Sequence, residues 1–291
     1  ISRIREYFNA ELPLKTLFES PTIATLAKEV ESSKTISSLP PLVPQEKPEH
    51  IPLSFAQQRL WFLDKLLPDI ALYNIPLSLR LKGTLNVPAF FKALNTLITR
   101  HASLRTVFDA HDTTPYQVIL PSLSFKEEDC YLNLSPSHKT DIHKILFQET
   151  NHPFDLSKGP LVRLKLIKLR EEEYVLLMTM HHIISDGWSM GILLQELSAC
   201  YNAYINNQSP PLSPLPIQYA DFAIWQRSWF EGEALEKQVT YWKNQLQGIP
   251  DQLSLPTDKP RPKELSYKGN HASFSLPKHL KKEILSFVQQ E

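Results

Sequence analysis

Hydrophobic and polar residues alternate with a period that changes repeatedly along the chain. Over residues 75–81 every second residue is apolar, the pattern of a strand with one buried face. The run 174–180 is apolar except at Thr179, which predicts a central strand covered on both faces. Phe90, Leu94, Leu97 and Ile98 instead recur at helical spacing. The chain therefore carries both kinds of element.

The same patterns predict further elements on both sides of these segments. Ser54 and Gln57 have capping-box spacing at the start of a helix that must stop near Pro68. Other helices are predicted over 137–150, 193–204 and 217–230, one ending near Gly248, and one over 279–291. Other strands are predicted over 103–108, 116–120, 161–169 and 271–276. Because strands and helices alternate, the predicted class is α/β.

The first 31 residues are expected to belong to a separate helical domain. Ser20 can cap a helix in which Ile23, Leu26 and Val30 share one face. So short a segment buries little by itself, so we expect the tail of a helical bundle. Residues 32–50, rich in proline and serine, are predicted to be a linker, and residues 51–291 a second domain. Both ends of the chain are expected to be truncated.

Composition narrows the possible partners and the cellular location. Lysine plus arginine equals aspartate plus glutamate, 31 of each, so no net charge attracts nucleic acid or an anionic membrane. The two cysteines lack metal-type spacing and fit a reducing compartment. No secretory signal and no apolar run of membrane-spanning length is visible in these residues. We therefore expect a cytoplasmic protein that binds neither nucleic acid nor membrane.

The stretch MHHIISDGWSM, residues 180–190, concentrates the candidate chemistry. Neighbouring side chains on a strand point to opposite faces, so only one of His181 and His182 can reach a given centre unless the strand bends. A histidine held in one tautomer is a general base near neutral pH. Asp186 can fold back under a turn, and Gly187 permits unusual backbone conformations or close approach. From these residues alone, a structural strand end and a catalytic site both stay open; a metal site is disfavoured.

This stretch resembles the HHxxxDG motif of condensation domains in nonribosomal peptide synthetases. The segments SFAQQRLWFL (54–63), RHASLRTVF (100–108) and YADFAIWQR (219–227) resemble three further motifs of that family, in the family's order. The resemblance covers residues 51–291 and implies a chloramphenicol-acetyltransferase-like lobe, a sheet flanked by helices, with the start of a second lobe. Residues 1–31 resemble the last helices of a peptidyl carrier domain, without the serine that bears phosphopantetheine.

The resemblance implies an acyltransferase that forms an amide bond between two carrier-bound substrates. The acceptor's α-amine attacks the donor's thioester, and both substrates are bound to phosphopantetheine arms of carrier domains. The resemblance also implies an adenylation domain downstream. His182 inherits the central role, with Asp186 and Gly187 beside it. His181, Arg105 and Trp188 are assigned supporting roles, and Arg105 is expected to pair with Asp186. The chain itself is expected to bind no cofactor or metal.

The motif variants resemble the subtype that joins an L-configured donor to an L-configured acceptor. With its second lobe incomplete, the chain is expected to be inactive by itself.

Two alternatives remain: a non-catalytic condensation-like domain that docks carriers, and a stand-alone acyltransferase that uses an HxxxD motif on coenzyme A thioesters. The other motif residues are expected mainly to pack or cap helices: Gln57, Arg59, Trp61, Tyr219, Asp221, Trp225 and Arg227.

Overall fold

The computed structural model describes residues 1–8, 10, 12–33, 40–68, 70–134, 142–250, 253–260, 262–263, 267, 269, 272 and 274–290. Contacts divide the chain into two units, Ile1–Gln247 and Gly248–Glu291, each described by itself. No helix in the described ranges combines the length and apolar character needed to cross a membrane.

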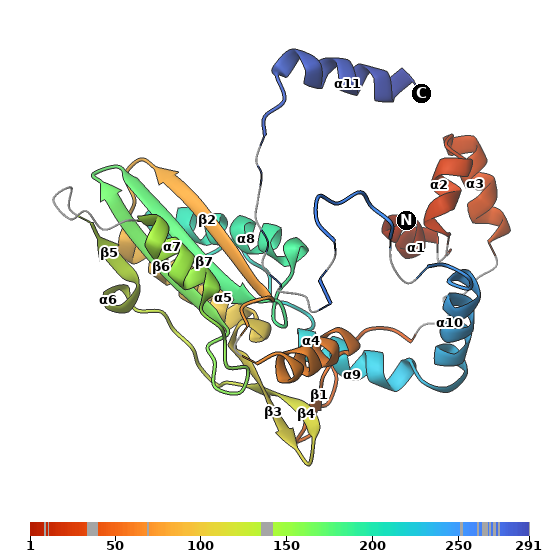
Figure 1. The fold of residues 1–291 in the computed structure, drawn as a ribbon, viewed down its shortest axis with the longest axis horizontal. Helices are drawn as coiled ribbons and strands as arrows, with labels where there is room; N and C mark the ends of the chain where they lie inside the picture. Colours follow the sequence, from red (N-terminus) through yellow and green to blue (C-terminus); the bar gives the residue numbers. More distant parts are fainter. Residues whose placement is uncertain are drawn as a thin grey trace. The chain divides into compact units, whose positions relative to one another are not determined.

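A four-stranded sheet in the order β2-β7-β6-β5 forms the centre of the first unit (Figure 1). Its strands are β2 (Asn74–Lys82), β7 (Glu173–His181), β6 (Val162–Arg170) and β5 (Tyr131–Asn133). β7 is antiparallel to both neighbours, whereas β5 runs parallel to β6. Every β7 residue after Glu173 is buried, which confirms the predicted central strand. β2 shows the predicted alternation of half-buried and exposed residues.

Helices cover both faces of this sheet. α5 (Val87–Arg100) and α8 (Gly187–Ile205) pack together, and their apolar side chains share one core with Leu176, Met178 and Met180 of β7. α7 (Ile142–Asn151) contacts β2 and β7 and lies on the opposite side of the sheet in Figure 1. The short α6 (Glu127–Cys130), like β5, was not predicted from the sequence. This sheet flanked by helices confirms the predicted α/β class.

A second, three-stranded sheet in the order β1-β4-β3 lies at one end of the lobe. It contains β1 (Ile51–Pro52), β3 (Thr106–His111) and β4 (Thr114–Ile119), with the 3-10 turn η1 (Ala102–Arg105) leading into β3. The strand predicted over 103–108 therefore begins only at Thr106. The first unit also contains α4 (Phe55–Leu66), α9 (Tyr219–Trp229) and α10 (Gly232–Gln245). The Ser54–Gln57 capping box is present, as predicted.

The N-terminal segment forms α1 (Ser2–Phe8), α2 (Leu14–Glu19) and α3 (Ile23–Ser32). The prediction that Ser20 caps the last of these helices is wrong. Ser20 ends α2, and Thr22 caps α3 by accepting a hydrogen bond from the Thr25 N–H at 3.2 Å. Thr22 directly precedes the helix, where its hydroxyl can reach the third helical N–H.

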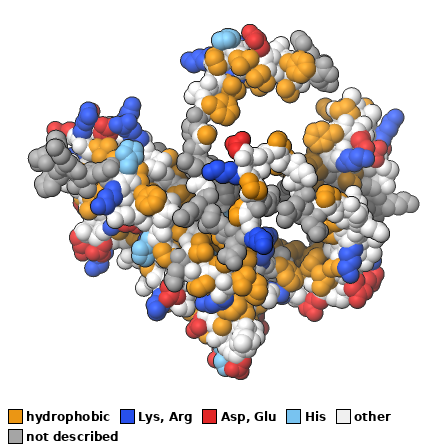
Figure 2. Space-filling view, viewed as in Figure 1, with side chains coloured by type: hydrophobic (Ala, Val, Ile, Leu, Met, Phe, Trp, Pro, Cys, Tyr) orange, Lys and Arg blue, Asp and Glu red, His pale blue; other side chains and the backbone are white. Residues whose placement is uncertain are grey.

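The second unit contains α11 (Lys278–Gln290), in agreement with the predicted final helix. Apolar side chains gather along it in Figure 2. Ile284, Phe287 and Val288 of this helix are exposed. The strand predicted over 271–276 is wrong where it can be judged: residues 272 and 274–276 have no strand structure, and residues 271 and 273 lie outside the described residues. A strand needs a hydrogen-bonded partner, and the described chain provides none there.

Candidate functional site

The HHIISDG segment is the turn by which the central strand passes into helix α8. β7 ends at His181 and α8 begins at Gly187. Ile183 and Ile184 are buried and belong to the main core. His182, which lies in sequence between the end of β7 and these isoleucines, has an exposed side chain. The His182 N–H donates to the Tyr73 carbonyl at 2.8 Å. Two apolar anchors therefore fix a short turn whose polar residues stay accessible.

His181 is the inward-facing histidine of the pair. Its side chain is 5% exposed and lies near the rings of Tyr73 and Phe154. Its Nδ1 accepts a hydrogen bond from the Ile183 N–H at 3.1 Å, so in the neutral ring the proton must reside on Nε2. Burial, together with the nearby charge of His182, lowers the pKa of His181 to about 4. At neutral pH it is an uncharged structural group that supports the turn.

His182 is held in the other tautomer. Its Nδ1 lies 2.9 Å from the Ser185 carbonyl oxygen, which can only accept, so Nδ1 must carry the proton. The lone pair is then on Nε2, for which the described chain provides no hydrogen-bond partner. A fixed tautomer with an exposed basic nitrogen is what a general base requires.

Asp186 caps the N-terminus of α8. Its Oδ1 accepts from the Ser189 N–H at 2.8 Å and from the Ser189 hydroxyl at 2.6 Å. These hydrogen bonds hold the pKa of Asp186 below its ordinary value, outweighing the opposing effect of burial. The predicted ion pair with Arg105 is wrong: Arg105 Nη1 donates to the Leu120 carbonyl, and no ion pair joins the two described side chains. The reason is local, since Ser189 satisfies the carboxylate within one helical turn.

Gly187 and Trp188 form the first turn of α8. Gly187 does not have a positive φ, so of the two expected uses of a glycine here the unusual backbone conformation is not observed. A Cβ built at Gly187 meets nothing of the described chain within 4 Å, so the position faces open space. Trp188 is 82% exposed and belongs to no described part of the core. Both positions are therefore open to a ligand approaching the turn.

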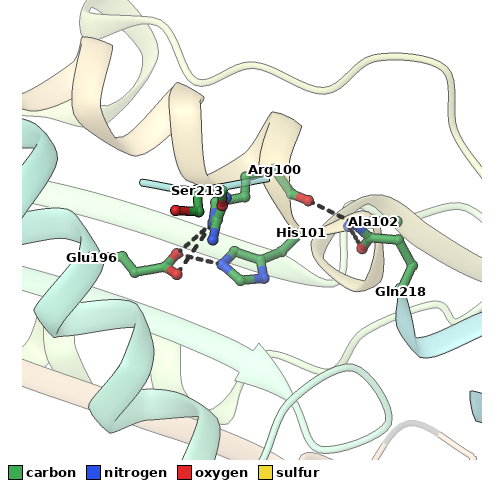
Figure 3. Close-up of polar contacts among 6 residues, drawn as sticks. All are labelled: Arg100, His101, Ala102, Glu196, Ser213 and Gln218. Carbon is green, nitrogen blue, oxygen red and sulfur yellow. Dashed lines mark hydrogen bonds and ion pairs between the residues drawn. The ribbon is translucent and has the colours of Figure 1, made fainter. Parts of the chain in front are cut away.

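The second motif forms a charged cross-link between α5 and α8 (Figure 3). Arg100 Nε donates to both carboxylate oxygens of Glu196 at 3.2 Å, and its Nη1 donates to the Ser213 carbonyl at 2.6 Å. His101 Nε2 lies 2.6 Å from Glu196 Oε2, so it carries a proton and donates. The Glu196 side chain is only 14% exposed. The contacts fix the end of α5 against α8.

The junction between α5 and η1 is held by Gln218, as Figure 3 also shows. Gln218 Nε2 donates to the Arg100 carbonyl, and its Oε1 accepts from the Ala102 N–H, both at 3.0 Å. A cavity of about 120 Å³ lies between η1 and the start of α8, lined in part by His101, Ser103, Ser185 and Ser189. It is large enough for several water molecules.

The first and fourth motifs contact each other and support the histidine turn. Ser54 Oγ lies 2.9 Å from Tyr219 Oη, and Arg227 Nε donates to the Leu53 carbonyl at 2.7 Å. These contacts fix the start of α4, from which the buried Gln57 reaches the Ile183 carbonyl at 3.5 Å. The capping spacing identified Gln57 as a helix start, but nothing in the sequence indicated that it also touches the turn.

Residues 47–291 match the family model described as "Condensation domain". Over its full length the chain is 43% identical to a linear gramicidin synthase polypeptide of Brevibacillus parabrevis, of which it covers 6%. It is 41% identical, over 97% of its length, to malpinin synthetase of Mortierella alpina, of which it covers 4%. The chain thus spans a small fraction of these curated relatives.

Two solved structures show the same fold. The X-domain in its complex with OxyB from teicoplanin biosynthesis superposes with a TM-score of 0.68 at 32% identity, over 77% of this chain and 49% of that one. The first condensation domain of the CDA synthetase superposes with a TM-score of 0.61 at 20% identity, over 72% of this chain and 53% of that one. These structures support the predicted chloramphenicol-acetyltransferase-like lobe.

Proposed function

Because this chain belongs to the condensation-domain family of nonribosomal peptide synthetases, we propose that it supplies the catalytic histidine of an amide-forming acyltransferase. Amide-bond formation is the general function of the family. The single observation that carries the assignment to His182 is its exposed side chain, whose Nδ1 donates to the Ser185 carbonyl and so leaves the lone pair on Nε2. His181 cannot take this role, because its ring is buried and its Nδ1 is occupied.

The proposed reaction joins a donor aminoacyl or peptidyl thioester to the α-amine of an acceptor. The amine nitrogen attacks the thioester carbon, the C–N bond forms, and the C–S bond then breaks to release the donor's thiol. An α-amine has a pKa of about 7.7–8.0, so much of it is neutral before attack. After attack the nitrogen is positively charged and acidic. His182 Nε2 accepts that proton, and the departing sulfur receives a proton in turn.

The other motif residues position this base. Asp186 holds the start of α8 through Ser189. Gly187 leaves space beside the turn, and we propose that its N–H faces the oxyanion that forms during attack. The turn and helix α8 are supported by His181, Gln57 and the Arg100–His101–Glu196 cross-link. Trp188 is exposed beside the turn, where a substrate would approach.

The proposed partners are two carrier domains and a downstream adenylation domain in the cytoplasm. We propose that residues 1–31 are the final helices of the donor carrier, residues 32–50 its linker, and residues 51–291 the condensation lobe with the start of a second. The phosphopantetheine arms come from the carriers. The motif variants support L-configured donor and acceptor groups. Since the chain covers about half of each solved relative, we propose that turnover needs the rest of the domain.

The likeness to the X-domain favours one alternative, a domain that docks a partner without catalysis. That domain was solved in complex with OxyB and shares 32% identity with this chain. In such a domain His182 would have no catalytic role. The two functions therefore differ in whether loss of the His182 imidazole matters.

The test uses a protein extended to a complete condensation domain, with donor and acceptor carriers loaded with L-aminoacyl groups. Mass spectrometry of the acceptor carrier should show a dipeptidyl thioester that is absent with His182→Ala. The matched control is His152→Ala, which removes another exposed imidazole outside the turn and should leave the product unchanged. No product from the folded wild-type protein, with carrier binding intact, would establish the docking alternative.

A further inference from the structure

The segment between the N-terminal helices and the condensation lobe is fixed to helix α9. Trp225 Nε1 donates to the Pro40 carbonyl at 2.8 Å. Five residues further along the linker, the Gln45 N–H donates to Asp221 Oδ1 at 3.0 Å, and Lys47 Nζ lies 3.6 Å from the same oxygen. Both α9 residues come from the YADFAIWQR motif, to which the proposed reaction gives no role.

Asp221 needs these linker groups because it is buried. Its side chain is 4% exposed, and Oδ2 accepts from the Gln218 N–H at 2.7 Å at the start of α9. Burial by itself raises the pKa of Asp221, but the Gln218 and Gln45 N–H groups and the Lys47 ammonium outweigh it and lower the pKa overall. A buried carboxylate without partners is costly, so helix and linker stabilise each other here.

A third attachment follows at the end of the linker. The His50 ring lies 4.4 Å from the Tyr116 ring of β4, and Ile51 pairs with Gln117 of the same strand. Residues 40–51 are thus held at three successive places on the lobe. The prolines at 40, 41, 44 and 48 lack N–H donors and favour extended backbone, so this path costs few unsatisfied groups.

We infer that Asp221 and Trp225 are positioning residues that fix where the upstream domain's tether leaves the condensation lobe, and so favour the carrier on the same chain as donor. This inference rests on the proposed function. With the linker attached at Trp225, the tether runs from the end of α3 near Ser33 to Pro40, about 7 residues. Without the α9 contacts it would run to Ile51, about 18 residues.

The magnitude follows from tether length. The effective concentration of a tethered partner falls roughly as the −3/2 power of the length of a coil-like tether. Lengthening the tether from about 7 to about 18 residues therefore lowers the carrier's local concentration on the order of fourfold. A carrier supplied as a separate protein has no tether and is indifferent to the linker's attachment.

The first experiment follows the linker itself. Hydrogen exchange with mass spectrometry is measured on the complete carrier–condensation protein, wild type against Asp221→Asn and Trp225→Phe. Asparagine keeps an acceptor for the Gln218 N–H, and phenylalanine keeps the ring beside Trp229, which lies 5.5 Å away. We expect faster exchange over residues 42–50 in both variants and no change in the control Trp229→Phe. Unchanged exchange in both variants would overturn the inference.

The second experiment measures product formation with the donor carrier either fused or supplied separately. Both variants should lower the fused rate by up to about fourfold and leave the separate-carrier rate at the wild-type level. An equal fall in both formats would instead show a general structural defect and overturn the positioning role. If the wild-type protein forms no product in either format, the proposed reaction fails, while the exchange measurement still decides whether α9 holds the linker.

Discussion

The buried His181 should make the stability of the lobe depend on pH in a predictable direction. Its pKa is about 4 in the folded protein, where burial and His182 disfavour the charged ring, against about 6.5 in an unfolded chain. Between these values the unfolded state binds more protons than the folded state. The neutral His181 ring therefore makes its full contribution to the free energy of unfolding above about pH 6.5, and this contribution is lost as the pH falls toward 4.

The expected loss at pH 5, relative to pH 7, is about 2 kcal/mol from this one group. The perturbation is His181→Asn, because an asparagine Oδ1 can accept the Ile183 N–H in place of Nδ1 but does not titrate. Urea unfolding followed by circular dichroism gives the free energy of unfolding at each pH. We expect the wild type to lose about 2 kcal/mol more than the variant between pH 7 and pH 5.

The control for this measurement is His111→Asn, which removes a histidine whose side chain is 69% exposed. It should keep the wild-type dependence on pH. If His181→Asn shows the same pH dependence as the wild type, the His181 ring is not held neutral by burial and the reasoning fails.

Substitutions at four further positions test the turn, one of its supports and a glycine outside the turn. Asp186→Ala should lower the free energy of unfolding by about 1 kcal/mol by removing the cap of α8, and Asp186→Asn by less; equal losses in thermal melts would contradict capping. Gly187→Ala should change stability by less than about 0.5 kcal/mol, since its Cβ meets nothing. Gly159→Ala should cost on the order of 1–3 kcal/mol, because φ is +54° and its Cβ would lie 2.6 Å from Val107; similar melting of the two glycine variants would refute this. Gln57→Ala should lower the free energy of unfolding by about 1–3 kcal/mol, because the Ser54 N–H and the Ile183 carbonyl lose this partner; a wild-type midpoint in urea would exclude that role.

Local patterns predicted most elements because their causes are local. The alternation over 75–81, the apolar run 174–180 and the Ser54 capping box each report the immediate surroundings of the backbone, and the structure confirms all three. Elements without such a signal were missed or misplaced. β5 has three residues and exists because β6 pairs with it, and the isolated segment around 274–276 has no described partner.

The candidate site divides in the same way. Strand geometry predicted that only one of His181 and His182 reaches a given centre, because adjacent side chains of a strand point apart, and the family resemblance chose His182. The predicted Arg105–Asp186 pair failed, because a carboxylate takes the nearest adequate donors and Ser189 lies three residues away. The spacing of Asp186 and Ser189 is that of a helix N-cap and could have indicated this partner, whereas the contact of Arg105 with Leu120 depends on where the end of β4 lies.

The sequence by itself determined the family, the class of fold and the identity of the motif histidines. Periodicity and capping are properties of neighbouring residues, and the order of the motifs can be read directly along the chain. Only the structure decided which nitrogen of each histidine is free, since that depends on how the turn places the Ile183 N–H and the Ser185 carbonyl. It also brought Gln57 to the turn across 126 residues, and Asp221 to the linker across 176. Such contacts form where packing places buried polar groups within reach of each other, and no local rule encodes that distance.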